Sequence, residues 1–387
     1  MSDSRPMPPM PRKVLMTADT VGGVWTYAIE LARGLADGGV EVALATMGEP
    51  LNDSQREKAD RIPHLRVFES TFKPEWTEDP WRDVEKAGDW LLGLEERVRP
   101  DVVHLNGFVH GSLPWSAPVV MAGHSCVLSW WQAVKGEAAP PEWERYAREV
   151  ANGLAAADLV IAPSEAMLAS LTAHYGPLAG EFVKTRVILN GRDPKAFKPS
   201  PKEPVVFAEG RLGDEARNLE ALERVAGNLP WDVFVAGEAL QPDGEIRPHH
   251  TRRLGRLSPR ALAAWLGRAA IYCLPARYEP FGLSAMEAAL SGCALVLGDI
   301  PSLRETWRHR AVFVAPDDPE ALESALLRLI EDPDRRASLA AGSRARALQL
   351  NTEKMLASYL AAYGEVLADR AAALLDDSGS YPAQVAV

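Results

Sequence analysis

The sequence predicts an α/β protein made of two similar units, each with a doubly wound parallel sheet. Two observations support this prediction. Short apolar runs alternate with longer amphipathic runs, which is the strand, crossover helix, strand order of an open parallel sheet. The alternation breaks once, at a proline-rich stretch near residue 200, and then restarts. Of the 387 residues, 47% are hydrophobic, so the chain holds enough apolar material for two cores.

The first unit opens with a buried strand over residues 13–18. Gly22 and Gly23 follow as a turn, and the apolar residues after them recur on one helical face up to Leu35. Further strands are predicted over residues 40–47, 65–68, 102–105, 119–122, 159–162 and 186–189, with helices over 81–98, 142–155 and 165–173.

The second unit begins after the prolines of residues 197–204. Strands are predicted over residues 205–208, 232–236, 271–274, 294–297 and 311–314, and helices over 218–226, 259–266, 283–290 and 319–330. After Asp334 the chain is predicted to be helical to about residue 370. We therefore divide the chain into a flexible leader (1–11), a first domain (12–199), a second domain (200–350), and a final helix with a frayed tail (351–387).

Bulk composition excludes several classes of protein. A net charge of −11 argues against broad nucleic-acid binding, which needs a basic surface. The three cysteines are widely spaced, so we expect buried thiols and neither a disulfide framework nor a zinc site. No apolar run reaches the length of a membrane span. We expect a cytoplasmic protein and leave peripheral contact with a membrane open; the sequence does not indicate an oligomeric state.

The most informative stretch is residues 275–289, where a strand leads into a helix through Pro280 and Gly282. A strand's carboxyl end followed by a helix N-terminus is the usual anion site of open α/β sheets. We expect the amides of Phe281, Gly282 and Leu283 to hold a phosphate.

Two carboxylates flank this predicted anion site. Glu279 precedes the helix and Glu287 lies in its second turn, and helical side chains lean toward the N-terminus, so both can reach one cavity. A carboxylate only accepts hydrogen bonds, which suits hydroxyls of a sugar and a ribose. The alternative for each residue alone is a solvated glutamate or a partner of the helix dipole.

This segment resembles the E-x7-E signature of glycosyltransferase family 4, a group of retaining enzymes that use nucleotide sugars. The resemblance extends in order from about residue 12 to residue 366, through residues 13–35, 101–104, 157–164, 187–191, 209–212 and 316–319. It implies the GT-B architecture: two Rossmann-like domains face each other across a cleft, and the C-terminal helix crosses back to the first domain. It also implies that the first domain binds the acceptor and the second the nucleotide.

The resemblance further implies a reaction and its substrates. A sugar moves from a nucleotide diphosphate sugar, with UDP or GDP as the nucleotide, to a hydroxyl of a glycan, a lipid-linked or a small-molecule acceptor, with retention at the anomeric carbon. We expect no cofactor and no metal. An epimerase or phosphorylase of the same fold, and a catalytically silent nucleotide-sugar binding protein, stay open as alternatives.

Donor contacts are carried over residue by residue from the family. Arg211 corresponds to an arginine on the donor pyrophosphate, and Arg217 stands where the family has a lysine. His124 is placed against the donor sugar, with Glu279 on a sugar hydroxyl and Glu287 on the ribose. Gly22 and Gly23 are expected near the diphosphate or the acceptor. Arg256 and Leu257 are also included among the donor-binding residues.

The acceptor site is less defined. Trp115, Trp130, Trp131 and Trp143 are expected to cluster around His124, with core packing as the alternative. The adjacent Trp130 and Trp131 cannot both be buried on one face of a strand, which favours an acceptor-site loop. Asn106, where the family often has a histidine, is a further candidate for the acceptor site.

Three other features are interpreted as structural. His104 lies within an apolar strand, and His249 and His250 are expected in an exposed loop. The only D-x-D sequence, Asp332 to Asp334, follows a predicted helix and is interpreted as a turn and not as a metal motif.

Overall fold

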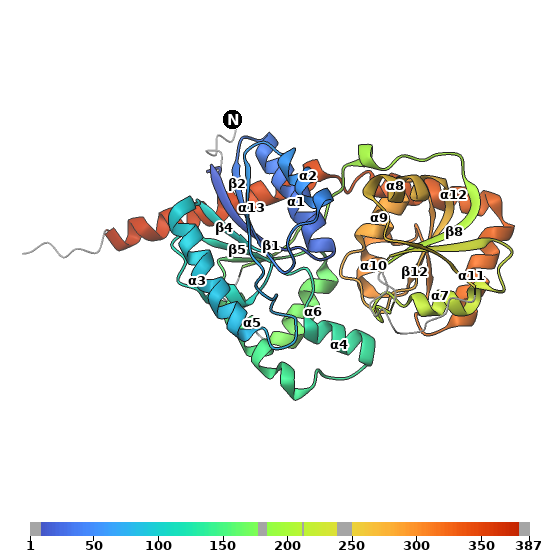
Figure 1. Ribbon diagram of the computed structural model, residues 1–387, viewed down its shortest axis with the longest axis horizontal. Coiled ribbons are helices and arrows are strands. Elements are labelled where there is room, and N and C mark those ends of the chain that lie inside the picture. Colours follow the sequence, from blue (N-terminus) through green and yellow to red (C-terminus); the bar gives the residue numbers. More distant parts are fainter. Residues whose placement is uncertain (1–8, 177–183, 211–212, 238–249, 379–387) are drawn as a thin grey trace, which may run out of the picture.

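The computed structural model describes residues 9–176, 184–210, 213–237 and 250–378. It contains two domains side by side, each with a parallel sheet between layers of helices (Figure 1). This confirms the predicted α/β fold with two doubly wound domains. Sequence patterning explains why both sheets are parallel, because the central strands are apolar without alternation and are buried on both faces.

The first sheet has seven strands in the order β3-β2-β1-β4-β5-β6-β7, and every neighbouring pair is parallel. The strands are β1 (Lys13–Asp19), β2 (Glu41–Met47), β3 (Leu65–Glu69), β4 (Val102–Leu105), β5 (Val119–Ala122), β6 (Leu159–Ala162) and β7 (Thr185–Val187).

Helices cover both faces of this sheet. The α-helices are α1 (Gly23–Asp37), α2 (Asp53–Asp60), α3 (Trp81–Val98), α4 (Val127–Lys135), α5 (Glu144–Ala156) and α6 (Glu165–Tyr175). Short 3-10 turns are η1 (Val109–Ser112), η2 (Pro141–Trp143) and η4 (Pro194–Ala196). Helix α1 packs in the core on one face, and α3, α5 and α6 pack on the other.

The second sheet has six parallel strands in the order β10-β9-β8-β11-β12-β13. Its strands are β8 (Glu203–Glu209), β9 (Asp232–Ala236), β10 (Arg252–Gly255), β11 (Ala269–Leu274), β12 (Ala294–Gly298) and β13 (Val312–Val314). Its helices are α7 (Leu219–Ala226), α8 (Pro259–Arg268), α9 (Leu283–Leu290), α10 (Pro301–Trp307), α11 (Pro319–Glu331) and α12 (Pro333–Ala347).

Side-chain caps set where several helices begin. Ser164, Ser258 and Asp318 each accept a hydrogen bond from the amide three residues later, at 3.1, 3.3 and 2.8 Å. Asp332 caps α12 in the same way, accepting from the Arg335 amide at 2.9 Å. The D-x-D sequence is therefore a helix cap at a turn, as predicted.

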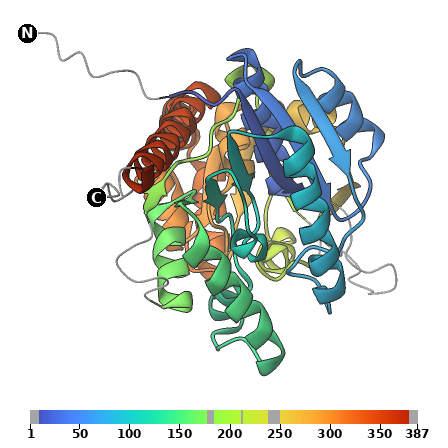
Figure 2. The ribbon, with the colours of Figure 1, turned by 90° about the vertical axis from the view of Figure 1, so that its left-hand side faces the viewer.

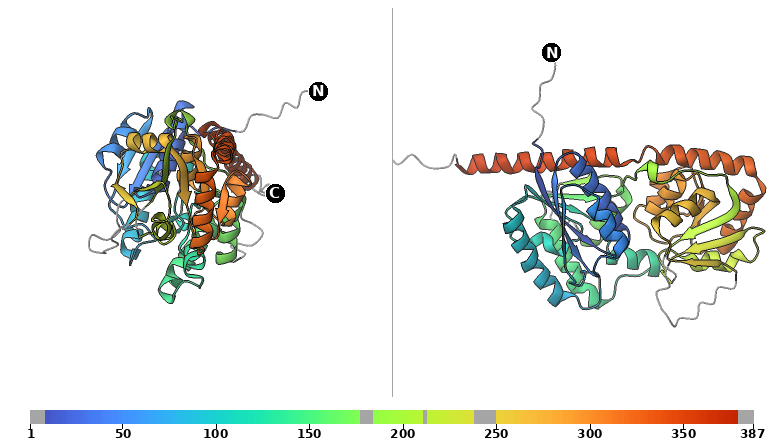
Figure 3. Two further views of the ribbon diagram at one scale, coloured as in Figure 1. Left: turned by 90° about the vertical axis from the view of Figure 1, so that its right-hand side faces the viewer. Right: turned by 45° about the horizontal axis from the view of Figure 1, so that its top comes forward.

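The last described helix, α13 (Thr352–Ser378), returns to the first domain (Figures 2 and 3). Tyr359 and Tyr363 are almost fully buried in the first core beside α1. The Tyr363 hydroxyl lies 2.6 Å from Nδ1 of His104 on β4, so the helix is joined to the sheet by a buried polar contact. His104 is structural, as expected.

Most predicted elements match the structure to within a few residues, but the single helix predicted after Asp334 is two helices, α12 and α13. Three α-helices and one strand were not predicted. Helices α2, α4 and α10 and strand β10 are short or lack a clear apolar period. All three cysteines are buried, as expected. The first eight residues, the histidine at 249 and the end of the tail lie outside the described residues. No helix in the described part of the chain is both long and apolar enough to cross a membrane.

Tyr359→Ala is expected to lower the free energy of unfolding by about 3–5 kcal/mol, because it leaves a cavity in the first core. Leu374→Ala on the same helix is the control, because Leu374 is 61% exposed. It should change stability by less than about 0.5 kcal/mol. Urea unfolding of both variants checks this, and equal effects would show that α13 is not part of the core.

Candidate active site

The strand order of each sheet reverses at one point, and ligands of open α/β sheets bind there, beyond the carboxyl ends of the strands. In the first sheet this point lies between β1 and β4; β1 ends at Asp19, and Asn106 directly follows β4. In the second sheet it lies between β8 and β11; Gly210 directly follows β8, and Pro275 directly follows β11. The site therefore draws on both domains.

Glu279 lies in the loop between β11 and α9, where its carboxylate covers the start of the helix. Its Oε1 accepts hydrogen bonds from the amides of Gly282 at 3.0 Å and Phe281 at 3.5 Å. Gly282 adopts a φ of 90°, which favours glycine, and a Cβ there would lie 2.9 Å from Leu303. We expected these amides to hold a phosphate. In the structure, the amides of Phe281 and Gly282 donate to the carboxylate of Glu279.

Arg217 precedes α7 and points toward the same loop. Its Nη1 donates to Ser284 Oγ at 3.0 Å, and its Nη2 lies 3.6 Å from Glu279 Oε2. The side chain is 28% exposed, so the guanidinium stays partly accessible. This places a cation beside the N-terminus of α9. Arg211 lies outside the described residues.

Glu287 lies on α9 and is held by an arginine that we did not predict. Arg192 Nη2 lies 2.7 Å from Glu287 Oε1, and Arg192 Nη1 donates to Glu30 Oε1 at 2.9 Å. Glu30 belongs to α1 of the first domain, so one cation pairs with a carboxylate from each domain. Arg192 directly follows the Asn190-Gly191 pair at the end of the first domain, but no spacing in the sequence indicates its partners.

Glu209 is the last residue of β8 in the second domain, and the sequence analysis did not single it out. Burial raises the pKa of its carboxyl, and nearby Glu287 adds to the effect, against Arg217 and Arg192. Its Oε2 is a buried atom without a hydrogen-bond partner in the described structure. The second domain thus contributes Glu209, Glu279 and Glu287 around two arginines.

His124 follows β5 in the first domain. Its Nε2 lies 2.9 Å from Asn106 Oδ1, and its ring contacts Tyr27 edge-on at 4.4 Å. Burial lowers its pKa to about 4, so the ring is neutral at pH 7. Asn106 Nδ2 donates to the Thr17 carbonyl at 2.7 Å. The amide of Asn106 therefore orients His124 against the end of β1.

A cavity of about 680 Å³ lies mainly on the first domain and reaches the second. Its lining includes Gly22, Gly23, Asn106, His124, Trp130, Trp131, Arg217 and Glu279, together with Glu75, which the sequence analysis missed. Eight of the predicted positions therefore share one cavity.

We expected the two adjacent tryptophans to lie in a loop, and this prediction was wrong. Trp130 and Trp131 lie on α4, with ring centroids 5.7 Å apart and planes at 82°. Successive residues on a helix differ by about 100° in direction, so both side chains can reach the same cavity from a helix. Trp143 also lines the cavity, whereas Trp115 packs against the core on the face of the first sheet that α3, α5 and α6 cover.

The glycine turn of the first domain faces the second domain across the site. Gly22 has a φ of 76°, and a Cβ on Gly23 would lie 3.8 Å from Leu283 Cδ1. Arg256 is exposed and Leu257 packs partly against the second core. The described cavity lining includes neither of these two residues.

Direct contacts hold the α9 loop against the first domain. Ser164 Oγ donates to the Pro280 carbonyl at 2.8 Å, and Glu305 of α10 accepts hydrogen bonds from the amides of Glu165 and Ala166 at 2.9 and 3.0 Å. The Tyr278 hydroxyl accepts from the Cys126 amide at 3.2 Å.

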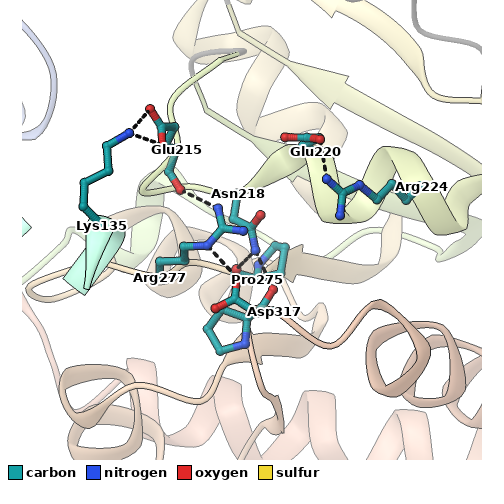
Figure 4. A network of polar contacts seen from close by, with 9 residues as sticks. Lys135, Glu215, Asn218, Glu220, Arg224, Pro275, Arg277 and Asp317 are labelled. Atoms are coloured by element: carbon teal, nitrogen blue, oxygen red, sulfur yellow. Dashed lines mark hydrogen bonds and ion pairs between the residues drawn. The ribbon is translucent and has the colours of Figure 1, made fainter. Parts of the chain in front are cut away.

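A charged contact lies beside these. Lys135 of α4 pairs with Glu215 of the second domain at 2.7 Å (Figure 4). Arg277 joins the Glu215 carbonyl to Asp317 at the foot of the same loop (Figure 4). Glu215 thereby links Arg277, in the loop between β11 and α9, to Lys135 of the first domain.

Among the described residues, no group of His, Cys, Asp or Glu side chains is arranged to hold a metal ion. His250 is exposed, and its amide donates to Glu223.

Two family models match the chain one after the other. The model described as Glycosyltransferase Family 4 matches residues 21–196, and that described as Glycosyl transferases group 1 matches residues 192–346. A D-inositol 3-phosphate glycosyltransferase of Thermobispora bispora is 26% identical, over 89% of this chain and 90% of its own. A glycogen synthase of Mycobacterium tuberculosis is 29% identical, over 84% of this chain and 86% of its own.

Solved structures share the fold. A sucrose-phosphate synthase of Thermosynechococcus elongatus superposes with a TM-score of 0.77 at 21% identity, over 92% of this chain and 100% of that one. The structure of HepE of Anabaena in complex with UDP-glucose gives a TM-score of 0.70 at 20% identity, over 92% of this chain and 99% of that one.

Arg192→Met is expected to lower the free energy of unfolding by about 3–5 kcal/mol, because Glu30 and Glu287 lose the cation between them. The control is Arg186→Met, because Arg186 and its partner Glu365 are 35% and 34% exposed. Loss of this exposed ion pair should lower the free energy of unfolding by only about 0–1 kcal/mol. Chemical unfolding distinguishes the two, and equal losses would contradict a buried interdomain pair.

Stability is expected to fall as the pH drops from 6.5 to about 4, partly through His124. Its pKa is about 4 in the folded chain and 6.5 when unperturbed, so in this range the unfolded chain binds the extra proton. This contribution is complete above pH 6.5 and is lost as the pH falls. His124→Gln should flatten the dependence by up to about 3 kcal/mol, whereas His64→Gln, at an exposed position, should not. Urea unfolding between pH 4 and 7 tests this, and parallel curves for both variants would refute it.

Proposed function

Because the chain belongs to glycosyltransferase family 4, we propose that it transfers a sugar from a nucleotide diphosphate to an acceptor hydroxyl with retention at the anomeric carbon. One observation carries the proposal. Glu279 and Arg217 of the second domain and His124 and the Gly22-Gly23 turn of the first line the same cavity.

The donor diphosphate is proposed to bind beside α9. Arg217 supplies a partly accessible cation there, and the helix N-terminus adds a favourable dipole for an anion. Arg211 is proposed to share this role. Positive charge from the arginines would stabilise the leaving diphosphate without a metal.

Carboxylates and the neutral histidine are proposed to hold the hydroxyls of the donor. Glu287 is set on the ribose, with Arg192 orienting its carboxylate at 2.7 Å. Glu279 and His124 are proposed to contact the donor sugar from opposite domains. The solved structure of HepE with UDP-glucose makes UDP-glucose the first donor to test.

The proposed chemistry takes place on one face of the sugar. The acceptor oxygen forms a bond to the anomeric carbon as the bond to the diphosphate oxygen breaks, and the acceptor proton passes to the leaving phosphate. No protein nucleophile is needed in this step. Contacts such as Ser164 to Pro280 keep the domains together and limit access of water, which would otherwise hydrolyse the donor.

A thermal-shift screen of UDP, GDP, ADP and their sugars tests the donor assignment. A ligand at 100 times its Kd should add about 2.7 kcal/mol of stability. Transfer, and not epimerisation or phosphorolysis, is then read from the products by NMR, which also reports the anomeric configuration. Sugar on free phosphate, an epimerised donor, or binding without turnover would each contradict the proposal.

Arg217→Met is expected to weaken binding of the nucleotide diphosphate by about 10–100-fold, the value of a hydrogen bond to a charged group. Arg224→Met on α7 is the matched control, because Arg224 is 59% exposed, pairs with Glu220 (Figure 4) and is not among the described lining residues of the cavity. Calorimetric titration with UDP measures both, and an unchanged Kd for the Arg217 variant would remove it from the donor site.

Glu279→Gln is expected to lower kcat by tenfold or more, because Gln has one acceptor oxygen where the carboxylate has two. Glu220→Gln, on an exposed face of α7, should keep full activity. Full turnover in the Glu279 variant would count against its contact with the donor sugar.

A further inference from the structure

Part of the cavity is not explained by the donor. Its donor end is formed by Arg217, Glu279 and Pro280 of the second domain. The opposite end lies within the first domain, around the loop between β3 and α3, and contains a carboxylate, Glu75. This end is open to the second substrate.

Glu75 is a built feature of this end and not a solvated loop residue. Its carboxylate accepts hydrogen bonds from the amides of Phe108, at 2.9 and 3.1 Å, and Val109, at 3.1 Å. Only 9% of the residue is exposed, and it lines the cavity. A Cβ at Gly107 would lie 3.1 Å from Glu75 Oε2, so glycine leaves room for the carboxylate.

The carboxylate keeps capacity for another donor. Two oxygens offer about four acceptor positions, and two backbone amides use only part of them. Among the described residues no cation forms an ion pair with Glu75. Burial raises the pKa of this carboxyl to about 7, against the two amides, and nearby Asp19 adds to the effect. A hydroxyl donating to Glu75 would replace hydration that burial removes.

Tryptophans line the same cavity as Glu75. Trp76 is 40% exposed, and Trp130, Trp131 and Trp143 also line the cavity. The perpendicular rings of Trp130 and Trp131 offer flat apolar faces from two directions. A carboxylate and tryptophan faces in one cavity suit a ligand with hydroxyls at its edge and an apolar face, as in a sugar ring.

Charge separates the acceptor classes. Four carboxylates are among the described lining residues: Asp19 and Glu75 belong to the first domain, and Asp214 and Glu279 to the second. The only lysine and arginine in this described lining are Lys73 and Arg217, and Arg217 belongs to the donor end.

Histidines add no positive charge to the lining at neutral pH. Burial lowers the pKa of both His110 and His124. Lys73 is exposed and donates to the Glu78 carbonyl at 3.2 Å. A phosphate on the acceptor would therefore face like charges.

We infer that this end of the cavity binds an uncharged acceptor with an apolar face, and that Glu75 accepts a hydrogen bond from one of its hydroxyls. The inference rests on the proposed function, because it assigns the second substrate of the same transfer. It excludes acceptors that are phosphorylated where they enter this end.

Matched ligands test the charge selection directly. Phenyl glucoside, phenyl galactoside and phenyl mannoside are titrated calorimetrically against the full chain, each beside its 6-phosphate, with and without saturating UDP. At least one neutral glycoside should bind at least tenfold more tightly than its 6-phosphate. Failure of all three neutral glycosides to bind, or equal or tighter binding of the phosphates, overturns the inference.

Variants test the role of Glu75. Glu75→Gln should weaken the neutral glycoside by about tenfold, the value of one hydrogen bond to a charged group, whereas Glu78→Gln in the same loop should not. Trp130→Ala should also weaken it, which gives a second variant if Glu75→Gln does not fold. Unchanged glycoside binding in both Glu75→Gln and Trp130→Ala refutes the site.

Titration with nucleoside diphosphates distinguishes a failure of the proposed function from a failure of the acceptor assignment. Failure of the unmodified chain to bind any of UDP, GDP and ADP would contradict the proposed function itself. Normal UDP binding without selection among the glycosides would contradict only the acceptor assignment.

Discussion

One buried arginine determines how the two domains meet. Arg192 lies where the chain leaves the first domain, and its guanidinium pairs with Glu30 on α1 and with Glu287 on α9. All three side chains are at most 15% exposed, so both ion pairs are shielded from solvent, and separating the domains would break the pair with Glu287. The position of α9 relative to the glycine turn before α1, and therefore the shape of the site, depends on this contact.

The two sheets supply different parts of one cavity for a geometric reason. Parallel strands direct their following loops to one edge, and in both sheets the strand order reverses near the middle of that edge. Contacts such as Ser164 to Pro280 bring those edges together. Arg217 and the N-terminus of α9 then lie on the second domain, and the tryptophans of the cavity lie on the first.

The fold and the turn between β11 and α9 could be predicted from the sequence because their signals are local. Apolar runs mark strands such as β11, and the Pro280 to Gly282 turn marks the start of α9. Pairings between distant residues could not be predicted. Nothing near Glu75 or Arg192 indicates that they meet Phe108 or Glu30, and the tryptophan pair was misplaced because α4 is too short to show a helical period.

The return of α13 to the first domain affects how the chain is made. Tyr359 and Tyr363 complete a core whose first strand, β1, leaves the ribosome hundreds of residues earlier. Until α13 emerges, the apolar side of α1 that it covers stays open to solvent in the nascent chain. The first domain is therefore the first to begin folding and the last to finish. The second domain folds between these two events, because its sequence lies between the first domain and α13. Such an order exposes apolar surface during synthesis, which is where a chaperone would act.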